Sequence, residues 1–230
     1  ILFYLFEGFY LMFCDILLFL LQLLRVEMYN SIRKSFFQVG RLNILRLILL
    51  GLIQIFCPDS IDRDSFYNKN IHPIHRIENH VRYDKMICHE IVEKIKNNTS
   101  SGKVVVAGCS FGGYHAANFA FRHPGYVSHL FSMGGAFDIK SFMDGFHNDD
   151  VFYNSPLDYL YGLDDYELWN MDIVLGTSNW DICFDANLKM SKVLSDRNIH
   201  HWLDIRQDKK HDWPVWTEMF PHYLSRIKFF

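Results

Sequence analysis

Residues 103–122 have the sequence KVVVAGCSFGGYHAANFAFR, and this stretch decides the expected fold. After its first lysine, segment 103–107 is apolar and rich in β-branched residues, which is typical of a central parallel strand covered on both faces. A glycine-rich turn at 108–113 follows directly, and residues 114–122 have a helical pattern that ends before Pro124. The sequence therefore predicts a strand, a sharp turn and a helix in immediate succession.

The turn contains the pattern Gly108-x-Ser110-x-Gly112. It matches the nucleophile elbow, a strained turn that exposes a serine hydroxyl, in which a larger side chain at either glycine would collide with its surroundings. Because glycine and serine are each about 7% of residues, chance would produce the pattern about 0.08 times in such a chain, so an incidental serine in a tight turn is the weaker alternative. We expect Ser110 to be a nucleophile and the backbone N–H of Phe111 to be one oxyanion-hole donor.

A serine hydroxyl needs an imidazole to take its proton and a carboxylate to orient that imidazole. In enzymes with this elbow the order along the chain is serine, acid, histidine. Among the twelve histidines, His211 lies after the last expected strand, 201–205, and before the closing helix expected at 215–227. We therefore predict that His211 is the general base.

The acid is expected in the loop that follows the preceding strand, which we predict at 173–175. Asp181 and Asp185 both follow this strand, whereas Asp172 precedes it. Asp181 lies within the loop, and Asp185 stands where a helix begins and where aspartate often serves only as a cap. We predict Asp181 as the acid and keep Asp185 as the alternative.

Other segments alternate between short apolar runs and amphipathic stretches, which predicts an α/β fold with a mostly parallel sheet flanked by helices. Further strands are expected at 52–57 and 127–133, and further helices at 79–96 and 187–194. The polar loop after the first of these strands contains Tyr67, Asn68 and His72, which we treat, together with Cys109, as candidate residues of a substrate cleft. The alternative for the loop residues is that they only close the loop with hydrogen bonds.

With these motifs the chain resembles a family of bacterial esterases in the α/β-hydrolase superfamily, distantly similar to esterase D and the mycolyltransferases. The resemblance runs roughly from residue 51 to 227 and rests on these blocks: 57–62, 66–68, 72–73, 108–120, 122–124, 180–181 and 211–216. It implies Ser110 as nucleophile, Asp181 as acid and His211 as base. It also implies hydrolysis of a small-molecule ester without a cofactor or a metal. An acyltransferase, or a binding protein that has lost catalysis, remains an alternative.

Residues 1–50 differ from this family, which should show two or more opening strands and an oxyanion loop there. Only 1–3 and 7–10 faintly resemble that loop, so the second oxyanion donor is unidentified, and the N-terminal region is atypical or truncated. Segment 9–24 is strongly apolar, but Glu7 stands just before it and Asp15 interrupts it, so we expect part of the core rather than a membrane span. We expect the catalytic domain at 51–230.

Composition narrows the class of protein further. The length of 230 residues favours one main domain, and the hydrophobic fraction of 50% suits a buried sheet. A net charge of −3 without basic runs argues against a nucleic-acid partner. The five widely spaced cysteines form no CxxC motif, so they predict neither a disulfide framework nor a zinc knuckle, and we expect a cytoplasmic protein.

Overall fold

The computed structural model describes residues 2–4, 44, 47–98 and 102–227. Within them the chain forms a parallel sheet with the strand order β1-β2-β3-β4-β5. The strands are β1 (Leu2–Tyr4), β2 (Val104–Cys109), β3 (Val127–Met133), β4 (Asp172–Trp180) and β5 (Trp202–Lys210). Since parallel strands all point the same way, the loops that follow them gather at one edge of the sheet, and this edge holds the candidate site.

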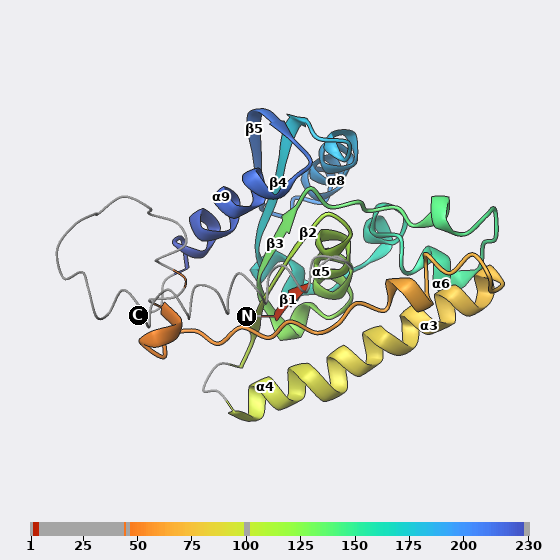
Figure 1. Ribbon diagram of the computed structural model, residues 1–230, viewed down its shortest axis with the longest axis horizontal. Helices are drawn as coiled ribbons and strands as arrows, with labels where there is room; N and C mark the ends of the chain where they lie inside the picture. The colour runs from red at the N-terminus through yellow and green to blue at the C-terminus, as the bar shows by residue number, and fades with distance from the viewer. Residues whose placement is uncertain (1, 5–43, 45–46, 99–101, 228–230) are drawn as a thin grey trace, which may run out of the picture.

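Helices cover both faces of the sheet (Figure 1). Helix α9 lies on one face, and α5, α8 and the long helix that begins with α3 lie on the other. Among the described residues from 73 onward, the α-helices are α3 (Pro73–Met86), α4 (Glu93–Asn98), α5 (Phe111–Arg122), α6 (Asp149–Phe152), α7 (Pro156–Tyr159), α8 (Phe184–Asp196) and α9 (Trp213–Leu224). A π-helical stretch, Ile87–Val92, joins α3 to α4 without a break, and the 3-10 turns are Asp62–Asp64, Pro124–Tyr126, Lys140–Phe142, Leu160–Gly162 and Tyr166–Asn170.

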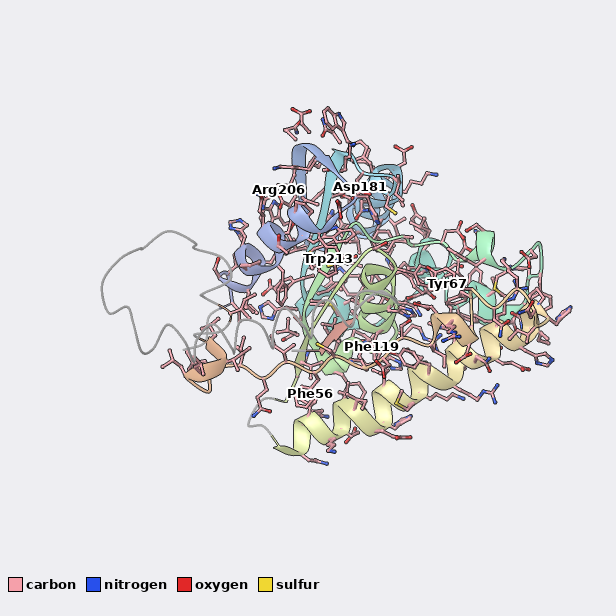
Figure 2. All side chains as sticks on the ribbon, viewed as in Figure 1. Phe56, Tyr67, Phe119, Asp181, Arg206 and Trp213 are labelled. Atoms are coloured by element: carbon pink, nitrogen blue, oxygen red, sulfur yellow. The ribbon has the colours of Figure 1, made fainter. Side chains whose placement is uncertain are left out.

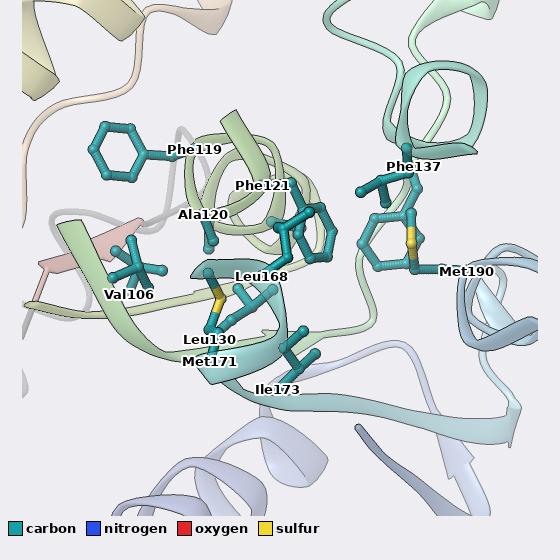
Figure 3. Packing of buried hydrophobic residues seen from close by; sticks show 14 of the residues in the cluster. Val106, Phe119, Ala120, Phe121, Leu130, Phe137, Leu168, Met171, Ile173 and Met190 are labelled. Atoms are coloured by element: carbon teal, nitrogen blue, oxygen red, sulfur yellow. The ribbon is translucent and has the colours of Figure 1, made fainter. Parts of the chain in front are cut away.

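The alternation of side chains along β2 divides the core into two layers. Val104 and Val106 pack into the cluster shared with α5 and α8, and Ala107 and Cys109 pack into the cluster shared with α9. Figure 3 shows the first of these clusters, in which side chains from the strands and α5 meet those of the loop before β4. A strand that is apolar on both faces is therefore required at this position, as its sequence predicts.

Most predicted elements are present, but several boundaries differ. Strand 127–133 is confirmed as predicted, whereas β4 and β5 extend several residues beyond 173–175 and 201–205 because ladder bonding continues into polar residues. The helix predicted at 79–96 begins earlier, at Pro73. The strand predicted at 52–57 is wrong: this segment has only a single bridge residue, Phe56, although Ile53 is buried.

The N-terminal expectations are tested only in part. The apolar segment 9–24 lies outside the described residues, and so does segment 7–10, which faintly resembles the oxyanion loop of the family. β1 pairs with β2 in parallel, from Leu2 opposite Val106 to Tyr4 opposite Gly108, so the start of the chain does contribute to the sheet. Among the residues that the structure describes, no helix is long and apolar enough to cross a membrane.

Leu130 tests the core of this fold. Its side chain is fully buried in the cluster between β3 and α5, so Leu130→Ala should lower the free energy of unfolding by about 2–5 kcal/mol through lost burial and a cavity. Urea unfolding measures this change. The matched control is Leu188→Ala on α8, where the side chain is 38% exposed and a loss below about 0.5 kcal/mol is expected. Equal losses in the two variants would contradict the assigned core.

Candidate active site

Ser110 lies between the end of β2 and the first residue of α5. Its φ of 55° and ψ of −124° lie in a region that non-glycine residues rarely adopt, which is the strained geometry of a nucleophile elbow. The backbone N–H of Ser110 donates to the carbonyl of Met133 at 2.8 Å. A Cβ at Gly108 would stand only 2.1 Å from the carbonyl oxygen of Gly112, so the turn requires glycine there.

His211 directly follows β5, and its two ring nitrogens have different partners. Nε2 lies 2.8 Å from Oγ of Ser110, and Nδ1 lies 2.7 Å from Oδ1 of Asp181. An ionised carboxylate only accepts hydrogen bonds, so Nδ1 carries the proton and Nε2 is left to accept from the serine hydroxyl. The ring edge also packs against Trp216, with centroids 4.9 Å apart and planes at 90°. The imidazole is thus held in the tautomer and orientation that a general base requires.

Asp181, labelled in Figure 2, follows β4. The structure brings this carboxylate, rather than the alternative ones, to His211. Its side chain is 1% exposed, and its Oδ1 also accepts the backbone N–H of Cys183 at 2.7 Å. Asp185 is exposed in the first turn of α8. Asp172 begins β4 at the other end of the strand, where it pairs with His129 at 3.3 Å.

Phe111 is the first residue of α5, so its backbone N–H stands at a helix N-terminus, where no intrahelical acceptor exists. Its ring is buried and packs against Tyr67 and Phe142, with centroids 5.5 and 5.1 Å apart. The amide is thus held beside Ser110 as the elbow requires. Residues after β1, where a second donor is expected, lie outside the described residues.

The four cleft candidates have different surroundings. Tyr67 is 36% exposed beside Phe111, as expected for a cleft wall. Asn68 and His72 make local hydrogen bonds: Oδ1 of Asn68 accepts from the N–H of Asn70, and His72 caps α3 by accepting from the N–H of Ile74. These contacts favour the loop-closing alternative for both residues.

Cys109 does not fit the predicted cleft. Its side chain is 3% exposed and belongs to the apolar cluster under α9, because strand alternation directs it away from the elbow side. Burial also raises the pKa of its thiol. This prediction is wrong because proximity to Ser110 in sequence does not place two side chains on the same face of a strand.

Behind the elbow, α5 is held in place by hydrogen bonds on the side of the helix that points toward α3. Nε2 of His115 lies 2.8 Å from Oδ1 of the fully buried Asp62, and the hydroxyl of Tyr114 donates to the carbonyl of Asn154 at 2.9 Å. Burial alone would raise the pKa of Asp62, but the adjacent His115 outweighs it and holds that pKa below its usual value. The carboxylate is therefore charged and paired behind the nucleophile helix.

The sequence predictions missed three residues that shape the site. Gly134 has a φ of +62°, and a Cβ there would lie 2.9 Å from Oδ2 of Asp181 and 3.1 Å from Nδ1 of His211. Arg76 is almost fully buried and holds the Tyr67 loop through the carbonyl of Asn68 at 2.7 Å and Oδ2 of Asp144 at 2.6 Å. The consecutive glycines after strand 127–133 were a usable signal for the first of these residues.

Cys183 is the third site residue that the sequence predictions missed. Its sulfur lies near the carboxylate of Asp181 and the imidazole of His211, and the ligand atoms of this trio lie within 4.8 Å of one another. Burial, followed by the negative charge of Asp181, raises the pKa of the Cys183 thiol to about 12. The group therefore stays protonated near neutral pH and is not an activated nucleophile.

Comparison with known proteins agrees with this geometry. Residues 68–211 match the family described as the alpha/beta hydrolase fold, and the chain belongs to that family. The predicted fold class and the resemblance to the α/β-hydrolase superfamily are therefore confirmed. A search of curated proteins found no match.

Solved structures share the fold at low sequence identity. A ferulic acid esterase superposes with a TM-score of 0.58 at 18% identity, covering 79% of this chain and 73% of that one. FphF, a fluorophosphonate-binding serine hydrolase of Staphylococcus aureus, gives 0.50 at 18% identity over 62% of each chain. An S-formylglutathione hydrolase from Agrobacterium tumefaciens gives 0.52 at 10% identity, covering 61% of this chain and 54% of that one.

Gly134 provides a test of the site geometry. Gly134→Ala should separate the imidazole of His211 from Asp181, because the new Cβ would lie 2.9–3.1 Å from both side chains, closer than ordinary van der Waals contact, in a backbone conformation that alanine rarely adopts. The downfield NMR signal of the Nδ1 proton should be lost or shifted. The matched control is Gly125→Ala, whose Cβ meets nothing within 4 Å, so the signal should be retained. An unchanged signal in Gly134→Ala would contradict the close contact.

Proposed function

We propose that this protein is a serine esterase that hydrolyses a carboxylic ester through an acyl-enzyme on Ser110. The observation that carries the proposal is the pair of hydrogen bonds, 2.8 and 2.7 Å long, that links Ser110 to His211 and His211 to Asp181. These three residues come from loops after three different strands, and their order along the chain is that of the α/β-hydrolase fold. The esterases among the structurally similar proteins agree with the proposal.

The arrangement supplies each step of acyl transfer. Nε2 of His211 takes the hydroxyl proton as Oγ of Ser110 attacks the ester carbonyl carbon. The N–H of Phe111 donates to the oxyanion that forms, and Asp181 stabilises the imidazolium. His211 then returns the proton to the leaving alcohol. A water molecule, activated by the same imidazole, releases the carboxylic acid and regenerates Ser110.

A fluorophosphonate probe tests the proposal because it reacts only with a serine activated by a base. The wild type should be labelled, Ser110→Ala should not, and His211→Asn should be labelled far more slowly. Ser128→Ala is the matched control, since that hydroxyl bonds to the start of β2 and to its neighbour His129, away from the elbow, and labelling should persist. A folded wild type that stays unlabelled would favour a non-catalytic binding protein instead.

Substituting two aspartates in turn tests which of them is the catalytic acid and which only stands at a helix N-terminus. Asp181→Asn should lower kcat for a chromogenic short-chain ester by about 10³- to 10⁴-fold, because the amide can donate to Nδ1 and leave the proton on Nε2. Asp185→Asn should change kcat less than about threefold, since its carboxylate is exposed and only favours the helix N-terminus. Comparable losses in both variants would reject Asp181 as the acid.

A further inference from the structure

Beside the hydrogen-bonded pair of Asp181 and His211 lies a third group with metal affinity, the thiol of Cys183. The carboxylate oxygen, the sulfur and the imidazole nitrogen all lie within 4.8 Å of one another. Cys183 is fixed in this position because it directly precedes α8 and its backbone N–H donates to Oδ1 of Asp181 at 2.7 Å. The mechanism proposed above does not use the thiol.

The three donor types match one class of metal ion. A mixed set of sulfur, nitrogen and oxygen is typical of Zn²⁺, whereas Ca²⁺ and Mg²⁺ prefer oxygen alone. Tetrahedral Zn²⁺ places such ligand atoms about 3.3–3.7 Å apart. The thiol would therefore move inward by about 1 Å, and the pair that is now 2.7 Å apart would open by less than that.

The three side chains differ in exposure. Cys183 is half-buried and the side chain of His211 is 13% exposed, whereas that of Asp181 is 1% exposed and would supply the innermost ligand. Three protein ligands leave the fourth tetrahedral position for a water molecule.

We propose that Asp181, Cys183 and His211 form an inhibitory Zn²⁺ site that overlaps the catalytic base and its carboxylate. Zn²⁺ would displace the thiol proton to solvent and bind sulfur, a carboxylate oxygen and Nδ1 of His211. The proton now on Nδ1 would move to Nε2, so the imidazole would present an N–H to Ser110 and could not accept the hydroxyl proton. The inhibitory effect rests on the proposed esterase function, but metal binding does not.

Cobalt substitution tests binding independently of activity. Co²⁺ added to the full chain should produce a near-ultraviolet sulfur-to-cobalt charge-transfer absorption that competes with Zn²⁺. The band should disappear in Cys183→Ala and persist in the matched control Cys57→Ala, which removes a half-buried cysteine outside the site. Absence of the band in the wild type, or its persistence in Cys183→Ala, would overturn the site.

Zinc titration tests the consequence. Micromolar Zn²⁺ should slow fluorophosphonate labelling and ester hydrolysis, and a chelator should restore both. Relative to its own metal-free rate, Cys183→Ala should need about tenfold or more Zn²⁺ for half-inhibition, because one of three ligands is lost, whereas Cys57→Ala should match the wild type.

Equal zinc sensitivity in wild type and Cys183→Ala would overturn the inhibitory role. The two proposals fail differently: metal-free wild type that is never labelled contradicts the esterase, while the cobalt band still decides whether the metal site exists.

Discussion

The backbone of Ser110 is held at a positive φ, and the rest of the site depends on this turn. Such a conformation costs on the order of 1–3 kcal/mol and persists only where its surroundings fix it. Here the fixing contacts are the hydrogen bond from Ser110 to Met133 on β3 and the close approach of Gly108 to Gly112. Because the turn joins β2 directly to α5, the hydroxyl is raised above the sheet edge, where the loops after β4 and β5 can reach it.

Helix α5 offsets this strain through its burial. Every residue from Phe111 to Phe121 is buried, which is unusual for a helix that also carries polar side chains. Buried polar atoms need partners, and those of Tyr114, His115 and Asn118 bond to groups in the loop before α3 and in the segment around Asn154. Contacts on the far side of α5 therefore fix the position of Ser110, and a helix held only by apolar packing would define it less well.

The sequence predicted the parts of the site that local chemistry determines. The elbow, Asp181 and His211 were identified because each follows a strand whose apolar pattern is visible in the sequence, and the structure brings these three side chains together. Segment 52–57 failed because an apolar run fits a strand only where a neighbouring strand pairs with it, which the segment itself does not specify. Gly134 was missed for a related reason, since its contacts are with residues distant in sequence.

The alignment of Asp181 with His211 depends on an irregularity between β4 and β5 that no sequence pattern indicates. Ser178 pairs with Arg206, but Trp180 pairs with Lys210, so β5 gains two residues over this short stretch. Without them, the residue beside Asp181 would be Lys209 rather than His211. Two side chains of β4 hold the two extra residues of β5 in place. The hydroxyl of Ser178 donates to the carbonyl of Lys209, and Oδ1 of Asn179 accepts the N–H of Asp208 at 2.7 Å.

Asp208 has a φ of 55°, a left-handed conformation that aspartate tolerates better than most residues. The register of the sheet, rather than the loops alone, thus determines which side chain meets the carboxylate. The same register also brings the imidazole near the Cys183 thiol, because Cys183 is held by its backbone hydrogen bond to Asp181. If β4 and β5 paired in a regular ladder up to their ends, Lys209 rather than His211 would lie beside Asp181. The hydrogen-bonded chain from Asp181 through an imidazole to Ser110 could then not form.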